Sequence, residues 1–277
     1  MHSTLLEIPL PWGGSIKIFA YGFMLATAFI TGMLLIKKRC KSRGCDLDTA
    51  LNLCMLVVAG SIIGARLFYC IQFHDEMKSI ADYFRIWKGG LVYYGGFFGA
   101  VIVTFAYCSV KKINFLEMAD LFSPSVALGI GLTRIGCFLN GCCYGPPTRS
   151  ALGVRFPLDA LPYQDPRVME QAAELGLNSA TPPLHPVQLY SSAGCFLMFV
   201  IVLLFEKKFA PPRGAVFLLF CVLYAIYRFL IEFVRIGNPN AYLGLTISQA
   251  ASIVVVIAAM IIVFITKRNA KENHLQS

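Results

Sequence analysis

Charged residues are scarce in this sequence, and their scarcity excludes a soluble protein. Only 14% of the 277 residues are Asp, Glu, Lys or Arg, whereas a soluble domain carries about 25%. Hydrophobic residues make up 57%, and the mean hydropathy is +0.67. The basic residues, which give a net charge of +9, fall in short clusters between apolar segments rather than in one patch, so nucleic acid is not an expected partner.

Residues 1–12 lack the features of a removable signal peptide. They have no basic start, no apolar core and no cleavage site of small residues. The first apolar segment is therefore expected to remain in the mature protein. No internal repeat is evident along the chain.

Long apolar runs are what the sequence has in quantity. A helix needs about 20 predominantly apolar residues to cross a bilayer core. Stretches of this kind occur at Ile18–Ile36, Ala50–Cys70, Leu91–Val110, Phe115–Leu139, Val187–Phe205, Ala215–Phe233 and Leu245–Thr266. They predict an all-α polytopic membrane protein with about seven transmembrane helices.

Every second connection between these stretches is rich in Lys and Arg, which by the positive-inside rule places it in the cytoplasm. The pattern predicts an amino terminus outside and a carboxyl terminus inside. A connection as long as the one before the fifth stretch is usually functional or a folded cap. The expected parts are an extracytoplasmic amino-terminal segment (1–17), a transmembrane domain (18–266) that includes an extracytoplasmic cap loop (140–186), and a cytoplasmic tail (267–277).

Three arginines lie inside apolar stretches. Arg66, Arg134 and Arg228 each precede the expected outer end of a helix by four or five residues, which at 1.5 Å per residue is roughly 6–8 Å. An arginine at mid-helix costs about 2.5–3.5 kcal/mol, so it normally faces a partner or a wet cavity. Glu232 follows Arg228 by one helical turn and can pair with it. The arginines either pair with carboxylates or, because acids are few here, bind an anion such as phosphate.

Five short motifs occur near the predicted outer ends of the helices. They are Tyr21-Gly22, KGGLVYYGG at 88–96, LTRIGCFLNGCCYG at 132–145, HPVQLY at 185–190 and RFLIEFVR at 228–235. In this order they resemble the signature segments of the prolipoprotein diacylglyceryl transferase family. The resemblance covers residues 21–235.

The resemblance implies an enzyme that moves the diacylglyceryl group of phosphatidylglycerol to the lipobox cysteine of a prolipoprotein signal peptide, forming a thioether and releasing glycerol phosphate. It implies a multi-pass protein of the bacterial cytoplasmic (inner) membrane, with its active site towards the outer leaflet, membrane lipids as partners, and neither cofactor nor metal. Arg134, Arg228, Tyr94 and Glu232 are the expected catalytic residues. Arg134 is also expected to bind substrate, together with Tyr21, Arg66, Gly95, Gly96, Cys137, Asn140, Gly145, His185, Gln188, Tyr224 and Arg235.

The sequence departs from the family pattern at three positions. Tyr94 stands where one form of the family has a histidine, proposed as the base that activates the thiol. With a pKa near 10, tyrosine is a poorer base, so the base is unassigned, with Glu232 and His185 as candidates. Cys137 and Cys142 replace an asparagine and a glutamate. Together with Cys143, these cysteines either pack as small side chains, form a disulfide or bind a metal. The metal site lacks histidines at ligand spacing.

Other features leave alternatives open. The spacing of Gly95 and Gly99 is typical of close helix packing. In the alternative interpretation, a backbone amide of Gly95 or Gly96 faces the phospholipid headgroup. Arg66 matches a position that is either functional or structural. Two other classes of function compete with the transferase: a membrane thiol redox protein that uses the cysteine cluster, and an anion or lipid transporter that uses the arginines.

Overall fold

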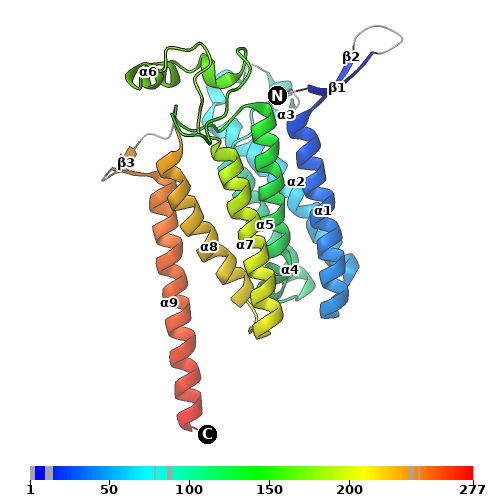
Figure 1. Ribbon diagram of the computed structural model, residues 1–277. Coiled ribbons are helices and arrows are strands. Elements are labelled where there is room, and N and C mark those ends of the chain that lie inside the picture. Colours follow the sequence, from blue (N-terminus) through cyan, green and yellow to red (C-terminus); the bar gives the residue numbers. More distant parts are fainter. Residues whose placement is uncertain are drawn as a thin grey trace. The chain divides into compact units, whose positions relative to one another are not determined.

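The structure, a computed structural model, is mostly helical and describes residues 4–9, 15–77, 79–85, 89–236, 240–242 and 244–276. Within these residues, six helices are long and apolar enough to cross a membrane, and a seventh has a shorter apolar part at Ile247–Val263. The long helices are α1 (Ala20–Arg43), α2 (Leu47–Gln72), α4 (Tyr93–Lys111), α5 (Phe115–Asn140), α7 (Val187–Phe209), α8 (Ala215–Ile231) and α9 (Ile247–Gln276) (Figure 1). The expected all-α polytopic membrane fold is confirmed.

Helix α1 is longer than the expected first stretch, which ended at Ile36. It continues to Arg43, so part of the expected basic loop is helical. Arg39 is buried, and its guanidinium donates to the backbone oxygens of Leu121 and Asp120 at 3.1 and 3.0 Å. Backbone carbonyls thus let this charge lie inside the protein.

Two helices end in the same way, at a glycine in the left-handed region. In α1 the amide of Cys45 donates to the oxygen of Cys40 across Gly44, and the two cysteines form a disulfide. In α5 the amide of Cys142 donates to the oxygen of Cys137 across Gly141. This six-to-one bond is the Schellman motif, which folds the chain back over the last helical turn.

One compact unit comprises Met33–Phe122 and is built on the packing of α2 against α4. Glycines make the contact: a Cβ at Gly95 would lie 2.3 Å from the oxygen of Gly64, and a Cβ at Gly99 2.2 Å from that of Gly60. The expectation of close helix packing is confirmed. Two short helices follow α2, η1 (His74–Glu76) and α3 (Ile80–Phe84).

The second compact unit comprises Met1–Gly32 and Ser123–Ser277. A buried cluster of Ala127, Met198, Val202 and Val216 joins α5, α7 and α8, and α9 packs along α8 (Figure 1). After α8 the chain tightens into a single 3₁₀ turn, η4 (Glu232–Val234). Two antiparallel hairpins, which the sequence did not predict, flank these helices: β1 (Thr4–Pro9) with β2 (Ser15–Phe19), and β3 (Asn240–Tyr242) with β4 (Leu245–Thr246).

The loop between α5 and α7 is folded. It contains η3 (Leu161–Gln164) and α6 (Pro166–Glu174) around a core of Phe156, Val168 and Leu184. Its place outside the membrane stays a prediction.

Asp165 begins α6 by accepting the backbone amide and the guanidinium of Arg167, and it also accepts the hydroxyl of Tyr144 at 3.1 Å. The hydrogen bonds from Arg167 lower the pKa of Asp165 to about 2. Burial, together with the hydrogen bond to Asp165, raises the pKa of Tyr144 to about 12.

Candidate functional site

A narrow pocket lies where the end of α5, the start of α7 and the end of α8 meet in the second unit. Its empty space is about 210 Å³, counting the part that opens to the surroundings. The pocket is lined by Arg134, Cys143, Val187, Ser191, Tyr227, Arg228, Ile231 and Arg235. Three guanidinium groups therefore face one small space, two of them on the helices where the sequence predicted them.

Arg228 is fixed on two sides. Its Nη1 lies 2.5 Å from Oε2 of Glu232, one turn later, and its Nη2 donates to the hydroxyl of Ser248 at 2.7 Å. The side chain of Glu232 is only 2% exposed, and that of Arg228 is 16% exposed. The predicted pairing is confirmed. The buried carboxylate and the hydroxyl hold the guanidinium in one orientation at the pocket wall.

Arg134 has no such partner. Among the residues that the structure describes, none makes a hydrogen bond or an ion pair with its side chain. It lies one turn of α5 before Cys137, and its side chain is partly buried. A partly buried guanidinium without a carboxylate is costly unless something else supplies the negative charge. With Glu232 as the one carboxylate paired to these three arginines in the described part of the chain, the pocket carries an excess of positive charge, which favours an anion.

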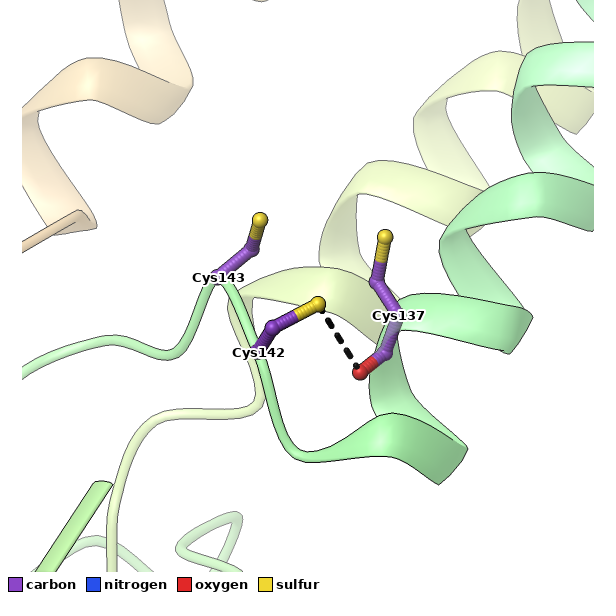
Figure 2. A group of neighbouring side chains, drawn as sticks. All are labelled: Cys137, Cys142 and Cys143. Carbon is purple, nitrogen blue, oxygen red and sulfur yellow. Dashed lines mark hydrogen bonds between the residues drawn. The ribbon is translucent and has the colours of Figure 1, made fainter. Parts of the chain in front are cut away.

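Arg235 and Cys143, one residue of a cysteine cluster, also line the pocket. The cluster consists of Cys137, Cys142 and Cys143, whose sulfur atoms all lie within 4.8 Å of one another (Figure 2). Nη2 of Arg235 lies 3.7 Å from Sγ of Cys143. All three cysteines are free thiols in the structure, and the disulfide is Cys40–Cys45 instead, which the sequence analysis did not anticipate.

Hydrogen bonds from Cys137 and Cys142, together with the charges of Arg235 and Arg134, hold the pKa of the Cys143 thiol below its ordinary value.

Three residues of the sequence motifs hold the turn that carries the cluster. Gln188 is 1% exposed and donates from Nε2 to the oxygen of Cys142 at 2.7 Å. The amide of Gly145 donates to the oxygen of His185 at 3.1 Å, and a Cβ at Gly145 would lie 2.5 Å from Val187. Nδ1 of His185 lies 3.2 Å from the hydroxyl of Tyr190. These contacts shape the pocket wall.

Other expected substrate-binding residues of this unit lie around the same end of α5. Tyr21 lies in the first turn of α1 next to Gly136, whose added Cβ would lie 3.4 Å from the Cα of Tyr21. Asn140 is the last residue of α5. Tyr224 stacks on Phe220, and its ring centroid lies 5.7 Å from that of Tyr227, a residue that lines the pocket. Their roles in binding stay predictions.

The remaining expected residues belong to the first unit, Met33–Phe122. The guanidinium of Arg66 donates to the backbone oxygens of Asp82, Tyr83, Gly89 and Gly90, so it holds the loop before α4. Gly95 packs against α2, and the amide of Gly96 donates to the oxygen of Val92 at 3.2 Å. Tyr94 is half exposed in the first turn of α4.

Comparison with known proteins decides the family. The family model described as prolipoprotein diacylglyceryl transferase matches residues 9–265. The chain belongs to this family. A phosphatidylglycerol–prolipoprotein diacylglyceryl transferase of Clostridium tetani is 36% identical over 251 residues, covering 89% of this chain and 92% of the relative.

Further relatives agree. A second such transferase, from Clostridium perfringens, is 35% identical, covering 93% of this chain and 94% of its own length. One from Xanthomonas axonopodis pv. citri is 31% identical, covering 92% and 89%. The similarity to prolipoprotein diacylglyceryl transferases therefore extends over nearly the whole chain, and it confirms the resemblance that the five motifs indicated.

Sequence reasoning missed some residues that build the pocket of this family member. Tyr227 and Ser191 line it, and Ser248 anchors Arg228 from the start of α9. A signal existed for Tyr227, which immediately precedes Arg228, and for Ser191, which lies almost one turn after Gln188. No sequence pattern indicated Ser248, because its position depends on the hairpin of β3 and β4.

Proposed function

We propose that this protein transfers the diacylglyceryl group of phosphatidylglycerol to the lipobox cysteine thiol of prolipoproteins. Its family and the printed names of its relatives support this reaction. The thiol sulfur attacks the glycerol carbon that carries the phosphate, a thioether forms, the carbon–oxygen bond breaks and glycerol phosphate leaves. The proton of the thiol is lost to the surroundings. A thiol redox protein and a transporter are not favoured, because the relatives are named as transferases.

The observation that carries the proposal is the excess of guanidinium groups around one pocket. As the carbon–oxygen bond breaks, a phosphate diester becomes a monoester and gains negative charge. Preorganised positive groups at that point stabilise the transition state more than the ground state, which is usually the largest catalytic contribution. Arg134, with no acid partner in the described chain, is available for the phosphate, whose geometry its fork matches.

We assign Arg228 to the same phosphate and Glu232 to positioning Arg228. The side chain of Arg228 is fixed by Glu232 and Ser248 before any substrate arrives, so little reorganisation is needed during the reaction. Arg235 adds a third positive charge at the rim of the pocket beside Cys143.

The two candidate bases that the sequence offered, Glu232 and His185, both contact other side chains in the structure. Glu232 is paired with Arg228, and His185 lies against Tyr190. A cationic environment lowers the pKa of a thiol and raises its thiolate fraction. We therefore propose that the guanidinium groups activate the incoming substrate thiol, and that Tyr94 orients a substrate by hydrogen bonding.

The reaction also implies a place for the protein. We propose that it lies in the cytoplasmic membrane with the carboxyl terminus inside, so that the cap loop (140–186) and the pocket face the outer leaflet. This orientation rests on the basic residues that follow the first, third, fifth and seventh apolar stretches.

The test uses the full-length protein in detergent with phosphatidylglycerol and a lipobox peptide, and mass spectrometry detects the thioether. We expect Arg134→Gln to lower kcat/KM by about 10²–10³-fold, the usual cost of losing one donor to a developing anion. Arg134→Lys should recover only part of this, because lysine lacks the guanidinium fork. The matched control is Arg167→Ala, which removes a mostly exposed arginine of the cap. Equal activity of Arg134→Gln and the control protein would refute the assigned role.

A further inference from the structure

The cysteine cluster brings three sulfur atoms to one place by two local devices. The Schellman motif at Gly141 folds Cys142 back over Cys137 at the end of α5. Cys143 then has a φ of 61°, a left-handed conformation that is uncommon for residues other than glycine. Figure 2 shows the side chains of Cys137 and Cys143 extending to the same side, with the sulfur of Cys142 between the two residues.

The spacing of the three sulfurs fits a shared ligand better than a disulfide. With metal–sulfur bonds of about 2.3 Å, three sulfurs around one ion lie about 4 Å apart, and here all three lie within 4.8 Å. A disulfide joins two sulfurs and leaves the third without a role. In α1 the same Cys-x-x-x-Gly-Cys sequence, with two cysteines, closes as the disulfide Cys40–Cys45. At the end of α5 a third thiol is added, and the structure keeps all three thiols free.

Thiolates are soft ligands that select ions such as Cu(I) and Zn(II) over hard cations. Three thiolates carry three negative charges, and the nearby positive groups are the guanidiniums of Arg235, 3.7 Å from Cys143, and Arg134, on the same pocket wall. A monovalent ion would make this assembly neutral, whereas a divalent ion would leave one positive charge.

We propose that Cys137, Cys142 and Cys143 form a binding site for one soft d10 cation, with Cu(I) as the ion that balances the charge. Binding forms three metal–sulfur bonds, and the three thiol protons pass to solvent. No electron is transferred. The sequence pattern argued against a metal because no histidine stands at ligand spacing, but a three-thiolate site needs none. The inference does not rest on the proposed transferase activity.

The test measures ion uptake directly by the full-length protein, reduced and kept anaerobic in detergent. Cu(I) is added in competition with a colorimetric Cu(I) chelator, a parallel arm uses Zn(II) with a colorimetric zinc chelator, and bound metal is counted by mass spectrometry. One variant removes the cluster: Cys137→Ser, Cys142→Ser and Cys143→Ser together. The matched variant keeps the cluster and replaces the other free cysteines by alanine, at Cys54, Cys70, Cys108, Cys195 and Cys221. Because reduction also opens the disulfide Cys40–Cys45, both of its cysteines are alanine in every protein compared, the otherwise unaltered one included.

We expect one ion per chain in the unaltered protein and in the matched variant, with a sulfur-to-copper absorption band in the Cu(I) arm, and none in the cluster variant. Should the triple change impair folding, Cys143→Ser alone keeps two thiols and should weaken binding by more than about tenfold, since even changes outside the ligands cost 10–100-fold. Three results would overturn the proposal: neither ion bound by the unaltered protein, equal uptake by the cluster variant, or a disulfide among the three cysteines that takes up neither ion after reduction.

Discussion

Glu232 has two possible roles, and a double-mutant cycle with Arg228 separates them. If Glu232 only positions Arg228, removing it should matter only while the arginine is present. If Glu232 is the base that accepts the thiol proton, its loss should cost activity whether or not Arg228 is there. The three proteins to compare with the unaltered one are Glu232→Gln, Arg228→Gln and the double variant.

The contact between the two residues sets the magnitudes. Nη1 of Arg228 and Oε2 of Glu232 are 2.5 Å apart, and the carboxylate side chain is 2% exposed. Losing a hydrogen bond to a charged group costs about 1.5–3 kcal/mol, which is the expected cost of Glu232→Gln in kcat/KM. Arg228→Gln should cost about 3–4 kcal/mol, or 10²–10³-fold. It also leaves the buried carboxylate without its cation, so the double variant should be more stable than this single variant.

The assay is thioether formation from phosphatidylglycerol and a lipobox peptide, and thermal unfolding in detergent gives stability. With a positioning role, the double variant loses no more activity than Arg228→Gln alone, because groups that act as a unit are strongly non-additive. Additive losses, totalling about 4.5–7 kcal/mol for independent sites, would refute positioning and make Glu232 the base.

Three further predictions concern the rest of the fold. Gly95→Ala should destabilise the protein by about 1–3 kcal/mol through overpacking against α2, while Gly22→Ala, which meets nothing within 4 Å, should not; loss of monodisperse protein on heating measures both. The pKa of Asp165 is lowered to about 2 in the folded protein, compared with about 3.9 in the unfolded chain. Its carboxylate therefore stabilises the fold above a pH of about 3.9, and this stabilisation is lost as the pH falls through about 2. The difference in unfolding free energy between the unaltered protein and Asp165→Asn, whose side chain can still cap the helix, should thus disappear between pH 4 and 2 when both are measured by calorimetry. Cells quenched with acid and alkylated should yield Cys40 and Cys45 as free thiols if that end of α1 is cytoplasmic; recovery of the disulfide would contradict the orientation.

The helices could be predicted from the sequence because lipid leaves the chain few alternatives. A backbone that crosses a bilayer must satisfy its own hydrogen bonds, so an apolar run of sufficient length is a helix. The two hairpins could not be predicted in this way. Strands β3 and β4 are only three and two residues long, and the alternation of β2 runs into the apolar stretch that begins at Ile18. The extent of α1 was also missed: Arg39 was expected in a loop, but the backbone carbonyls of Asp120 and Leu121 accept hydrogen bonds from its buried guanidinium.

The candidate site was predictable where helical spacing governs it. The depth of Arg134 and Arg228 on two parallel apolar stretches, and the one-turn spacing to Glu232, follow from 1.5 Å per residue. The contact of Arg235 with Cys143 does not, because it depends on the 3₁₀ turn η4 and on the left-handed φ of Cys143. Neither is encoded in periodicity, so the sequence left packing, a disulfide and a metal site all open for the cysteine cluster.

The two proposed sites share a wall, and their ligands should therefore oppose each other. Cys143 belongs to both the cysteine cluster and the pocket, and Arg235, which lies 3.7 Å from its sulfur, also lines the pocket. Cu(I) held by three thiolates adds negative charge to a pocket that needs positive charge for a phosphate. By linkage, the ion must weaken lipid binding by the same factor by which the lipid weakens ion binding. Coupling of this kind is typically about 5–150-fold.

We expect short-chain phosphatidylglycerol to lower the Cu(I) affinity measured by chelator competition, and Cu(I) to lower lipid affinity by an equal factor. Cu(I) affinity that stays constant at saturating lipid would show that the cluster and the phosphate pocket are independent.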